Sequence, residues 1–317
     1  MKAITLKETG DIEKLQFAEV STPTIKKDEV LVQVKAISIN PVDAFVRQHQ
    51  QALISYLQPK PDEDAFILGW DISGIVVATG DQVTQFKKGD EVFGMVNFPG
   101  HGNAYAEYVA APASHLALKP QTINHAEAAA ATLAALTAWQ ALMTYAKVKK
   151  GDKVLIHAAA GGVGHYAVQI AKHFGAYVIG TASTSNKEFV LSLGADEFID
   201  YTQEKFEDRV QDADIVIDSI YGDHVLRSLD TVKKGGRVIT LLTFFEGTIA
   251  DKAKAKEVFT HRLGVVSNGD DMQQIATLLA SAALKSHISH NYVFQEMPKA
   301  HQQIATGKTQ GKIVVSL

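Results

Sequence analysis

The feature that most constrains this chain is "KVLIHAAAGGVGHYAVQIAKHFG", residues 153–175. The apolar residues at its start are typical of a buried strand, and the later residues have apolar side chains at helical spacing up to Gly175, a predicted helix cap. The small residues between them follow the spacing of the G-x-G-x-x-G pattern, with Ala159 at the first position and Gly161 and Gly164 at the others. We therefore predict a strand, a glycine turn and a helix in that order.

A turn of this kind is suited to binding phosphate groups. Its glycines let the backbone approach a pyrophosphate, and the N-terminus of the next helix offers free N–H groups and a partial positive charge. A second apolar strand, "AYVIGTA" at 176–182, follows the helix, which is the context of a dinucleotide fold rather than of a ligand-free turn. The residues predicted to contact the dinucleotide are Gly161, Gly162, Val163 and Gly164.

The end of that second strand indicates which dinucleotide is bound. NAD sites usually carry Asp or Glu there, about 20 residues beyond the glycines, to bind the ribose 2′-hydroxyl. Here the strand continues into "STSNK", which includes Ser183 and Lys187 and no acidic residue. Hydroxyl groups and an ammonium group would hold a 2′-phosphate that a carboxylate would repel. The sequence therefore favours NADP(H) over NAD(H).

The pattern of apolar segments changes near residue 120. Before it, short runs such as "EVLVQVKAI" and "DISGIVVATG" predict a β-rich region. After it, Ala-rich helical segments alternate with apolar strands, which predicts an α/β fold with a doubly wound parallel sheet. The strands predicted there are "KVLIHAA", "AYVIGTA", "EFIDY", "DIVIDSI", "GRVITLL" and "RLGVVS". A helix at 270–284, the strand "HNYVFQ", a short helix and the closing strand "GKIVVSL" follow.

Composition disfavours several classes of function. The chain has 317 residues, a formal net charge of -4 and no cysteine, so it can form neither disulfides nor thiolate zinc sites. Its basic residues are scattered among carboxylates, and no apolar run reaches the roughly 18 residues of a membrane span. We therefore expect neither a nucleic-acid partner nor a membrane partner. A basic apolar leader is absent from the sequence, so we expect a cytoplasmic location.

Several segments carry a resemblance to a known family. In order, they are "INPVDAFVR", "LGWDISGIVVATG", "FKKGDEVFG", "LTAWQAL", "AAAGGVG", "LGADEFIDY" and "GKIVV". Over essentially its whole length the chain resembles the zinc-independent quinone oxidoreductases, the zeta-crystallin-like branch of the medium-chain dehydrogenase/reductase superfamily. The resemblance implies a GroES-like catalytic domain at 1–124, a Rossmann NADP-binding domain at 125–267 and a return to the catalytic domain at 268–317.

The zinc-dependent alcohol dehydrogenases of that superfamily hold a catalytic metal with Cys and His ligands. In this chain Asn40 stands in the region of the first ligand, and Trp70 replaces the histidine. Two nearby carboxylates, Asp43 and Asp71, make a poor zinc site without His or Cys. We therefore predict no metal site. Three histidines without a complete ligand set are interpreted as surface or structural residues: His101 in a loop, and His287 and His290, which are spaced i, i+3 at a predicted helix end.

A reductase without a metal is limited in the acceptors that it can reduce. Quinones and α,β-unsaturated carbonyls spread the incoming charge over a phenolate or an enolate, whereas an isolated ketone gives an alkoxide that requires a metal or a positioned acid. The predicted activity is therefore NADPH-dependent hydride transfer to a small apolar quinone or enone. The alternatives are an enoyl-thioester reductase and a non-catalytic NADPH-binding or sensing protein.

The resemblance also suggests individual roles. Asn40 would lie beside the nicotinamide ribose or the substrate carbonyl as a hydrogen-bond donor, although an asparagine before Pro41 is also typical of a turn. Tyr56 lies before "LGWD", a region where some enoyl reductases carry a proton-donating tyrosine.

Four further residues are predicted to contact the cofactor. Thr137 matches a threonine on the cofactor side, and Tyr201 matches a residue on the adenine side near the 2′-phosphate. Leu242 and Ser267 end the predicted strands "GRVITLL" and "RLGVVS", and the carboxyl ends of such strands bind ligands. Because family dimers often pair the edge strands of two sheets, here "RLGVVS", we predict a homodimer.

Overall fold

The computed structural model describes residues 1–60 and 63–317, which form two compact units. Unit 1 comprises Met1–Leu136 and Val266–Leu317, and unit 2 comprises Thr137–Val265. The assignment of a catalytic domain and a cofactor domain, with boundaries at residues 124 and 267, stays a prediction. None of the described helices is long and apolar enough to cross a lipid bilayer.

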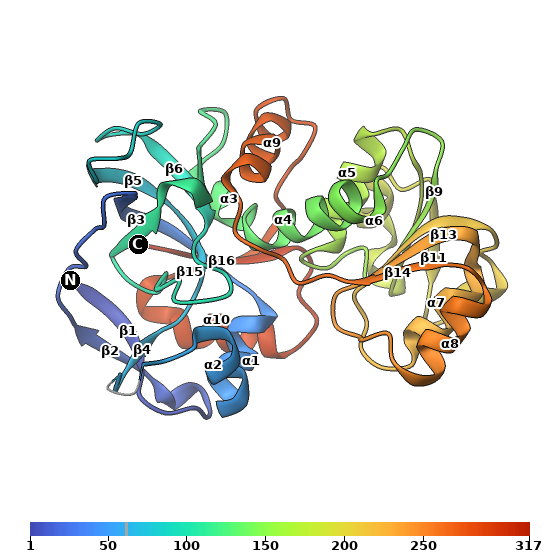
Figure 1. Ribbon diagram of the computed structural model, residues 1–317, viewed down its shortest axis with the longest axis horizontal. Helices are drawn as coiled ribbons and strands as arrows, with labels where there is room; N and C mark the ends of the chain where they lie inside the picture. The colour runs from blue at the N-terminus through green and yellow to red at the C-terminus, as the bar shows by residue number, and fades with distance from the viewer. Residues whose placement is uncertain (61–62) are drawn as a thin grey trace. The chain divides into compact units, whose positions relative to one another are not determined.

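Unit 2 is built on one parallel sheet of six strands (Figure 1). Their order is β11-β10-β9-β12-β13-β14, so the chain winds outward from β9 in one direction and then from β12 in the other. This is the doubly wound arrangement of the Rossmann fold, and it confirms the predicted fold class. The strands are β9 (Lys153–Ile156), β10 (Tyr177–Ala182), β11 (Glu197–Asp200), β12 (Ala213–Asp218), β13 (Val232–Thr240) and β14 (Phe259–Arg262).

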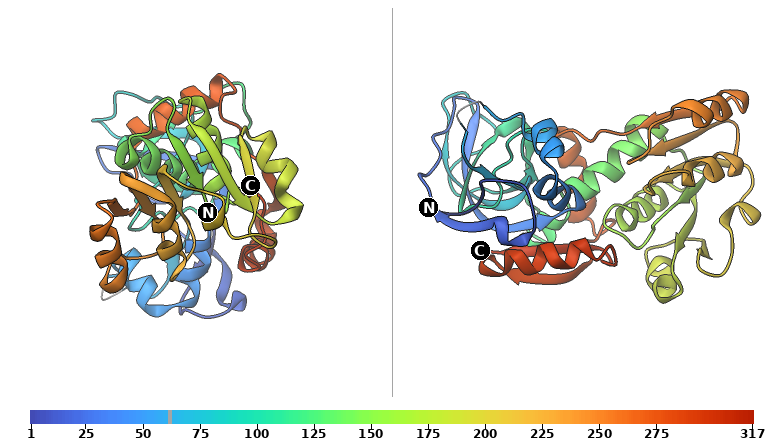
Figure 2. Two further views of the ribbon diagram at one scale, coloured as in Figure 1. Left: turned by 90° about the vertical axis from the view of Figure 1, so that its right-hand side faces the viewer. Right: turned by 90° about the horizontal axis from the view of Figure 1, so that it is seen from below.

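Helices connect these strands and cover both faces of the sheet, because parallel neighbours cannot be joined by tight turns. In Figure 1, α5 and α6 lie on one side of the strands and α7 and α8 on the other, and Figure 2 shows the strands side by side. The core between them includes the buried side chains of Leu155, Val216 and Leu229. The helices are α5 (Gly164–His173), α6 (Lys187–Ser192), α7 (His224–Thr231) and α8 (Gly247–Ala255). Before β9 come α4 (Leu133–Trp139) and the π-helix η3 (Gln140–Ala146).

Unit 1 is rich in β-structure, as predicted. Its larger sheet has the order β15-β16-β3-β5-β6-β8, with β7 paired to β3, and a smaller sheet has the order β2-β1-β4. The strands are β1 (Lys2–Leu6), β2 (Leu15–Glu19), β3 (Glu29–Ile39), β4 (Phe66–Ile67), β5 (Asp71–Thr79), β6 (Glu91–Met95), β7 (Tyr108–Pro112), β8 (Leu116–Leu118), β15 (Ile288–Val293) and β16 (Lys312–Ser316). The helices are α1 (Pro41–Gln48), α2 (Gln50–Leu57), α3 (His125–Ala130), α9 (Gly269–Ala280) and α10 (Met297–Ala305).

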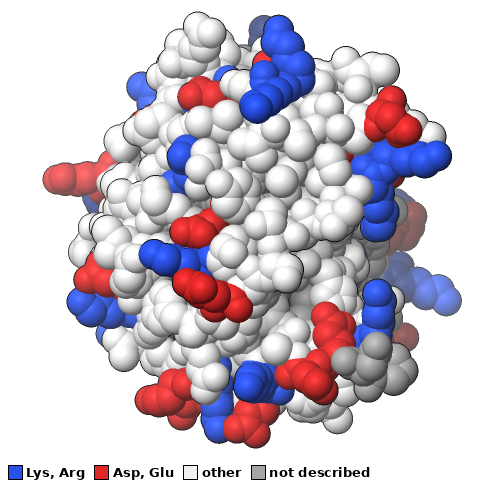
Figure 3. All heavy atoms as spheres, turned by 90° about the vertical axis from the view of Figure 1, so that its left-hand side faces the viewer, with Lys and Arg blue, Asp and Glu red and all other residues white. Residues whose placement is uncertain are grey.

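The C-terminal segment completes unit 1. Strand β16 pairs antiparallel with β3, so that Val314 lies opposite Ser38, and Val314 packs against Ala129 and Ala130 of α3. The apolar pattern of "GKIVVSL" therefore predicted a strand correctly, and the structure places it between β15 and β3. On the face of unit 1 drawn in Figure 3, basic and acidic side chains lie next to one another, as the near balance of charge suggests.

Two sequence predictions of secondary structure were wrong. The edge strand is Phe259–Arg262 rather than 262–267, because Arg262 pairs with Thr240, the last residue of β13, and no partner strand remains beyond it. His287 and His290 do not lie near a helix end, because α9 ends at Ala280 and His290 belongs to β15, where it pairs with Ile313.

Candidate functional site

The loop between β9 and α5 forms the predicted glycine turn of unit 2. The strand ends at Ile156 and the helix begins at Gly164. A Cβ atom at Gly164 would lie 2.1 Å from the carbonyl oxygen of Ala158 and 2.8 Å from the Cα atom of Ala159. No side chain tolerates such distances. Glycine at this position therefore allows the helix to begin directly against the end of the strand.

The exposed side of this loop fits an anion. Gly161 and Gly162 are only half-buried and have no side chain, so their backbone can be reached from solvent, and Val163 is also half-buried. The first turn of α5 carries no acidic side chain that would neutralise the partial positive charge of the helix N-terminus. The turn thus suits the pyrophosphate of a dinucleotide, as the sequence predicted.

The end of β10 carries the residues predicted for the 2′-phosphate. Ser183 directly follows the strand and is half-buried, and its hydroxyl oxygen accepts a hydrogen bond of 2.9 Å from the side chain of Asn186. Lys187 begins α6 and is exposed. Both side chains therefore belong to one short segment at the carboxyl end of the sheet.

Sequence reasoning missed an acidic residue beside this segment. Asp200 ends β11 and lies opposite Ala182 in the sheet, so its carboxylate reaches the hydroxyl group of Thr184. It also accepts hydrogen bonds from the backbone (2.9 Å) and the hydroxyl group (2.6 Å) of Thr202. These hydrogen bonds lower the pKa of Asp200, and the charge of Lys187 contributes further. The predicted sheet could have indicated Asp200, because parallel pairing brings the ends of the second and third strands together.

The other predicted cofactor residues lie in different environments. Thr137 is buried in α4, Tyr201 follows β11 with 61% of its surface exposed, and Leu242 lies two residues beyond β13 with 49% exposed. Ser267 does not end a sheet strand, so that prediction was wrong. It belongs to unit 1, where its hydroxyl oxygen accepts a 2.8 Å hydrogen bond from the backbone of Phe98.

In unit 1, Asn40 lies within a buried polar network. It precedes α1 and is 1% exposed, and its backbone N–H donates to the Asp43 carboxylate at 2.6 Å. Its side-chain nitrogen donates to Asp71 at 2.7 Å, and its side-chain oxygen accepts from the ammonium group of Lys312. Lys312 also donates to the carbonyl oxygen of Ile39 at 3.2 Å. The amide of Asn40 is therefore held on both sides by charged groups.

The ionisable groups of this network have shifted pKa values. Burial, followed by repulsion from Asp71, raises the pKa of the Asp43 carboxyl to about 7. Burial also raises the pKa of Asp71 and lowers that of Lys312, while attraction between Lys312 and the two carboxylates opposes these shifts. Lys312 was not among the predicted site residues, although a lysine next to the apolar residues of "KIVV" was a signal for a buried cation.

A second buried group, His301, gives a prediction for acid stability. Its Nε2 atom lies 3.0 Å from the Tyr105 hydroxyl, its Nδ1 atom accepts from Arg47 at 3.3 Å, and burial lowers its pKa from 6.5 to about 3. Between these two values the unfolded chain binds a proton that the folded chain excludes, so stability falls as the pH falls. We expect His301→Gln to lessen the loss of unfolding free energy from pH 7 to pH 4 by about 3 kcal/mol in urea titrations. An unchanged pH dependence would contradict this assignment.

Three aromatic side chains form a cluster in unit 1. Tyr56 is on α2, Trp70 directly precedes β5, and Phe98 follows β6. The ring centroids are 6.4 Å apart for Tyr56 and Trp70, 5.6 Å for Tyr56 and Phe98, and 5.1 Å for Trp70 and Phe98. Trp70 is fully buried and its indole N–H donates to the carbonyl oxygen of Gly100 at 2.7 Å, whereas the other two rings are half-buried. The cluster thus offers an aromatic surface backed by a fixed indole.

Comparison with known proteins assigns the family. Residues 26–121 match the alcohol dehydrogenase GroES-like domain, and residues 193–315 match the zinc-binding dehydrogenase family. The chain is 35% identical to the chloroplastic NADPH-dependent alkenal/one oxidoreductase of Arabidopsis thaliana, over 99% of this chain and 79% of that protein. It is 32% identical to the quinone oxidoreductase of Homo sapiens, over 100% of this chain and 98% of that protein. The chain belongs to the medium-chain dehydrogenase/reductase superfamily.

A solved structure supports the same assignment within the superfamily. The quinone oxidoreductase from Coxiella burnetii is 35% identical and has a TM-score of 0.92, with 100% of this chain and 99% of that chain covered. The family that the sequence indicated is therefore confirmed.

The superfamily includes zinc-dependent members, and Trp70 stands where they have a histidine ligand of the metal. The Trp70 indole can only donate, and its N–H already bonds to Gly100. The Asp71 carboxylate accepts from Asn40 at 2.7 Å and from the backbone of Leu133 at 3.0 Å, and the chain contains no cysteine. These side chains do not fit the catalytic zinc ion of the zinc-dependent members.

Proposed function

We propose that this protein is an NADPH-dependent oxidoreductase that reduces quinones or the double bond of α,β-unsaturated carbonyl compounds. The observation that carries the proposal is the start of α5 at Gly164, where the glycine turn and an unneutralised helix N-terminus suit a pyrophosphate. The relatives named as alkenal/one oxidoreductase and quinone oxidoreductase support this substrate class.

The residues of unit 2 account for binding of the nucleotide. Backbone N–H groups at the start of α5 would bind the pyrophosphate, and Ser183 and Lys187 would hold the 2′-phosphate. When NADPH is bound, its nicotinamide supplies the hydride. The residues of unit 2 proposed to contact it are Thr137, Gly161, Gly162, Val163, Gly164, Ser183, Lys187, Tyr201 and Leu242. The predicted contact through Ser267 of unit 1 is retained as part of the proposal.

The residues of unit 1 account for the choice of acceptor. The aromatic cluster of Tyr56, Trp70 and Phe98 would contact a planar apolar acceptor. A quinone or enone spreads the added charge over a phenolate or enolate, so its reduction does not require a metal ligand set. Because its amide is held by Lys312 and Asp71, we assign Asn40 a positioning role and propose the half-buried Tyr56 hydroxyl as the proton donor.

The test of this function is a comparison of three acceptors. NADPH oxidation is measured with a benzoquinone, a 2-alkenal and a crotonyl thioester, each at several concentrations. The proposal predicts turnover with the quinone, the alkenal or both. Turnover with the thioester alone would support an enoyl-thioester reductase. NADPH binding without turnover on any acceptor would support a sensing protein, and either result would overturn the proposal.

The role of Tyr56 can be separated from that of the aromatic surface. Reduction of an enal requires a proton on the α-carbon, and a positioned acid contributes about 10²–10⁴-fold to such a step. A reduced quinone is protonated on oxygen, which water can do rapidly. We therefore expect Tyr56→Phe to lower kcat for the 2-alkenal by about 100-fold or more and to change quinone reduction less than threefold. Equal effects on both acceptors, or none on either, would contradict the role of proton donor.

Cofactor preference tests the segment at the end of β10. We expect Lys187→Ala to weaken NADPH binding about 10-fold without affecting NADH, because only NADPH carries the 2′-phosphate. Asp200→Asn should strengthen NADPH binding, since it removes a negative charge beside the same segment. Dissociation constants are measured by fluorescence titration, with Lys254→Ala on the exposed face of α8 as the control. Equal losses for both nucleotides would argue against a 2′-phosphate contact.

The proposal also includes the location and the oligomeric state of the protein. We place the protein in the cytoplasm and propose that it forms a homodimer through β14, the edge strand of the parallel sheet. Phe259 of this strand has 45% of its surface exposed, which would suit pairing with a second copy.

A further inference from the structure

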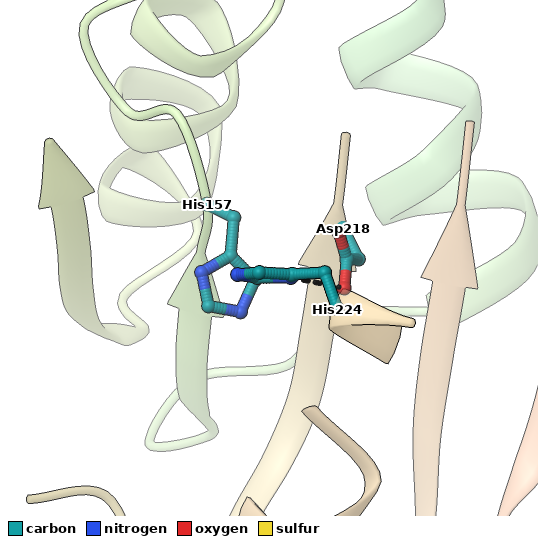
Figure 4. A group of neighbouring side chains, drawn as sticks. All are labelled: His157, Asp218 and His224. Atoms are coloured by element: carbon teal, nitrogen blue, oxygen red, sulfur yellow. Dashed lines mark hydrogen bonds and ion pairs between the residues drawn. The ribbon is translucent and has the colours of Figure 1, made fainter. Parts of the chain in front are cut away.

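A group of three metal-ligand side chains lies at the centre of the parallel sheet of unit 2. His157 follows β9, Asp218 ends β12 and His224 begins α7. Figure 4 shows the three side chains directed toward one another. One ligand atom from each lies within 4.8 Å of the others, and no other such group of three occurs in the described parts of the chain. Strands β9 and β12 are neighbours in the sheet, so parallel pairing brings these residues together.

The carboxylate of this group is buried without a permanent positive partner. Asp218 is 0% exposed, and among the described residues its one ion pair is with His224, at 2.9 Å. It also accepts hydrogen bonds from the Ser228 hydroxyl (2.7 Å) and the backbone of Ile220 (2.9 Å). The nearby guanidinium group of Arg227 pairs with Glu207 instead. Buried carboxylates in proteins are paired with a positive group or coordinate a metal ion.

Both imidazoles offer ring nitrogens that could bind a metal ion. His157 is 1% exposed. Its Nδ1 atom lies 3.1 Å from the Thr181 hydroxyl and its Nε2 atom 3.1 Å from the Ser228 hydroxyl. Because hydroxyl groups can rotate and either donate or accept, one ring nitrogen can bind an ion while the other donates a hydrogen bond. His224 is only partly buried, which leaves a route for entry from solvent.

We propose that His157, Asp218 and His224 form a binding site for a divalent transition-metal ion such as Zn²⁺. Two imidazoles and one carboxylate are a ligand set that zinc commonly uses. The Ser228 hydroxyl lies 3.1 Å from His157 and 2.7 Å from Asp218. Ligands in a tetrahedral zinc site are about 3.3 Å apart. The 2.9 Å between His224 and Asp218 would therefore widen slightly on binding, and the widest spacing in the group, which is up to 4.8 Å, would shorten.

The site is structural rather than catalytic in this proposal. The Ser219 hydroxyl donates to the carbonyl oxygen of His157 at 3.3 Å, and His157 is the first residue after β9 in the glycine turn. A bound ion would therefore join the start of this turn to the end of β12 and the start of α7. Binding of the ion at this site does not depend on the acceptor or on the activity proposed above.

The test uses the full chain after removal of metal with a chelator. Zn²⁺ is titrated by calorimetry, and Co²⁺ by its visible absorption, at pH 7. We expect one ion per chain and the strong visible bands of a four-coordinate Co²⁺ site. His224→Gln can still donate a hydrogen bond to Asp218 but lacks the imidazole ligand, so we expect at least 100-fold weaker binding. His173→Ala, which removes an exposed histidine on α5, should bind as the unsubstituted chain does.

Three results would overturn the proposal. They are the absence of stoichiometric binding, equal affinity in His224→Gln, and the weak bands of six-coordinate Co²⁺. The first would show that the chain has no such site, and the other two would show that the ion binds to other groups. Circular dichroism establishes that the variants are folded. If His224→Gln does not fold, the Co²⁺ spectrum of the unsubstituted chain decides the question, since a four-coordinate spectrum supports the site and a six-coordinate one rejects it.

Discussion

Replacement of the buried lysine Lys312 by methionine is expected to lower the free energy of unfolding by about 3–5 kcal/mol. The ammonium group donates to the side-chain oxygen of Asn40 and to the carbonyl oxygen of Ile39, and its charge acts on Asp43 and Asp71 in the buried network. Methionine fills a similar volume but leaves the buried carboxyl groups of Asp43 and Asp71 without this positive charge. Urea unfolding at pH 7, followed by circular dichroism, measures the loss.

The pH dependence of this loss provides a second measurement. The Asp43 carboxyl already has a pKa raised to about 7, so it takes up a proton as the pH falls toward 5 and the uncompensated charge is reduced. The difference between Lys312→Met and the unsubstituted chain should therefore be smaller at pH 5 than at pH 7. Lys308→Met, an exposed lysine of the same C-terminal segment, is the matched control and should lie within about 0.5 kcal/mol of the unsubstituted chain. A loss below 1 kcal/mol for Lys312→Met would contradict the proposed charge compensation.

Substitution of Gly164 by alanine is expected to have the largest effect on nucleotide binding. The added Cβ would lie 2.1 Å from the backbone oxygen of Ala158, and backbone atoms cannot yield as a flexible side chain can. The start of α5 must therefore move away from β9, which should cost about 1–3 kcal/mol of stability or more. The same movement would displace the N–H groups proposed to bind the pyrophosphate. We expect the NADPH dissociation constant to rise by at least 100-fold in a fluorescence titration.

Gly161→Ala is the matched control for the loss of stability. A Cβ atom at Gly161 would meet only the Ala158 oxygen, at 3.2 Å, which a shift of a few tenths of an ångström relieves. It should destabilise the protein less than Gly164→Ala does. If Gly164→Ala bound NADPH normally, the glycine turn would have no role in nucleotide binding, and the proposed function would lose the observation on which it depends.

Local patterns in the sequence were sufficient for the architecture of unit 2. Alternation of apolar strands with helical segments predicted the parallel sheet, and the spacing of Gly161 and Gly164 placed the start of α5 correctly. These predictions succeeded because they depend on backbone hydrogen bonding and on the periodic burial of neighbouring residues. The prediction of the edge strand at 262–267 failed because the length of β14 depends on where its partner β13 ends, at Thr240.

The candidate site was only partly predictable for the same reason. The residues of the glycine turn are close in sequence, whereas the partners of Asn40 are Asp71 and Lys312, which are separated from it by 31 and 272 positions. Asp200 approaches the segment after β10 only because β10 and β11 are paired in parallel.

The sequence alone determined the fold class, the family and the position of the glycine turn, because each is encoded by residue types at short, regular spacing. The tertiary structure alone decided that Asn40 is enclosed by charged groups, that Ser267 belongs to unit 1, and that His157, Asp218 and His224 meet. Contacts of that kind depend on which strands become neighbours and in which register. They follow from packing of the whole chain, which no local pattern of residues specifies.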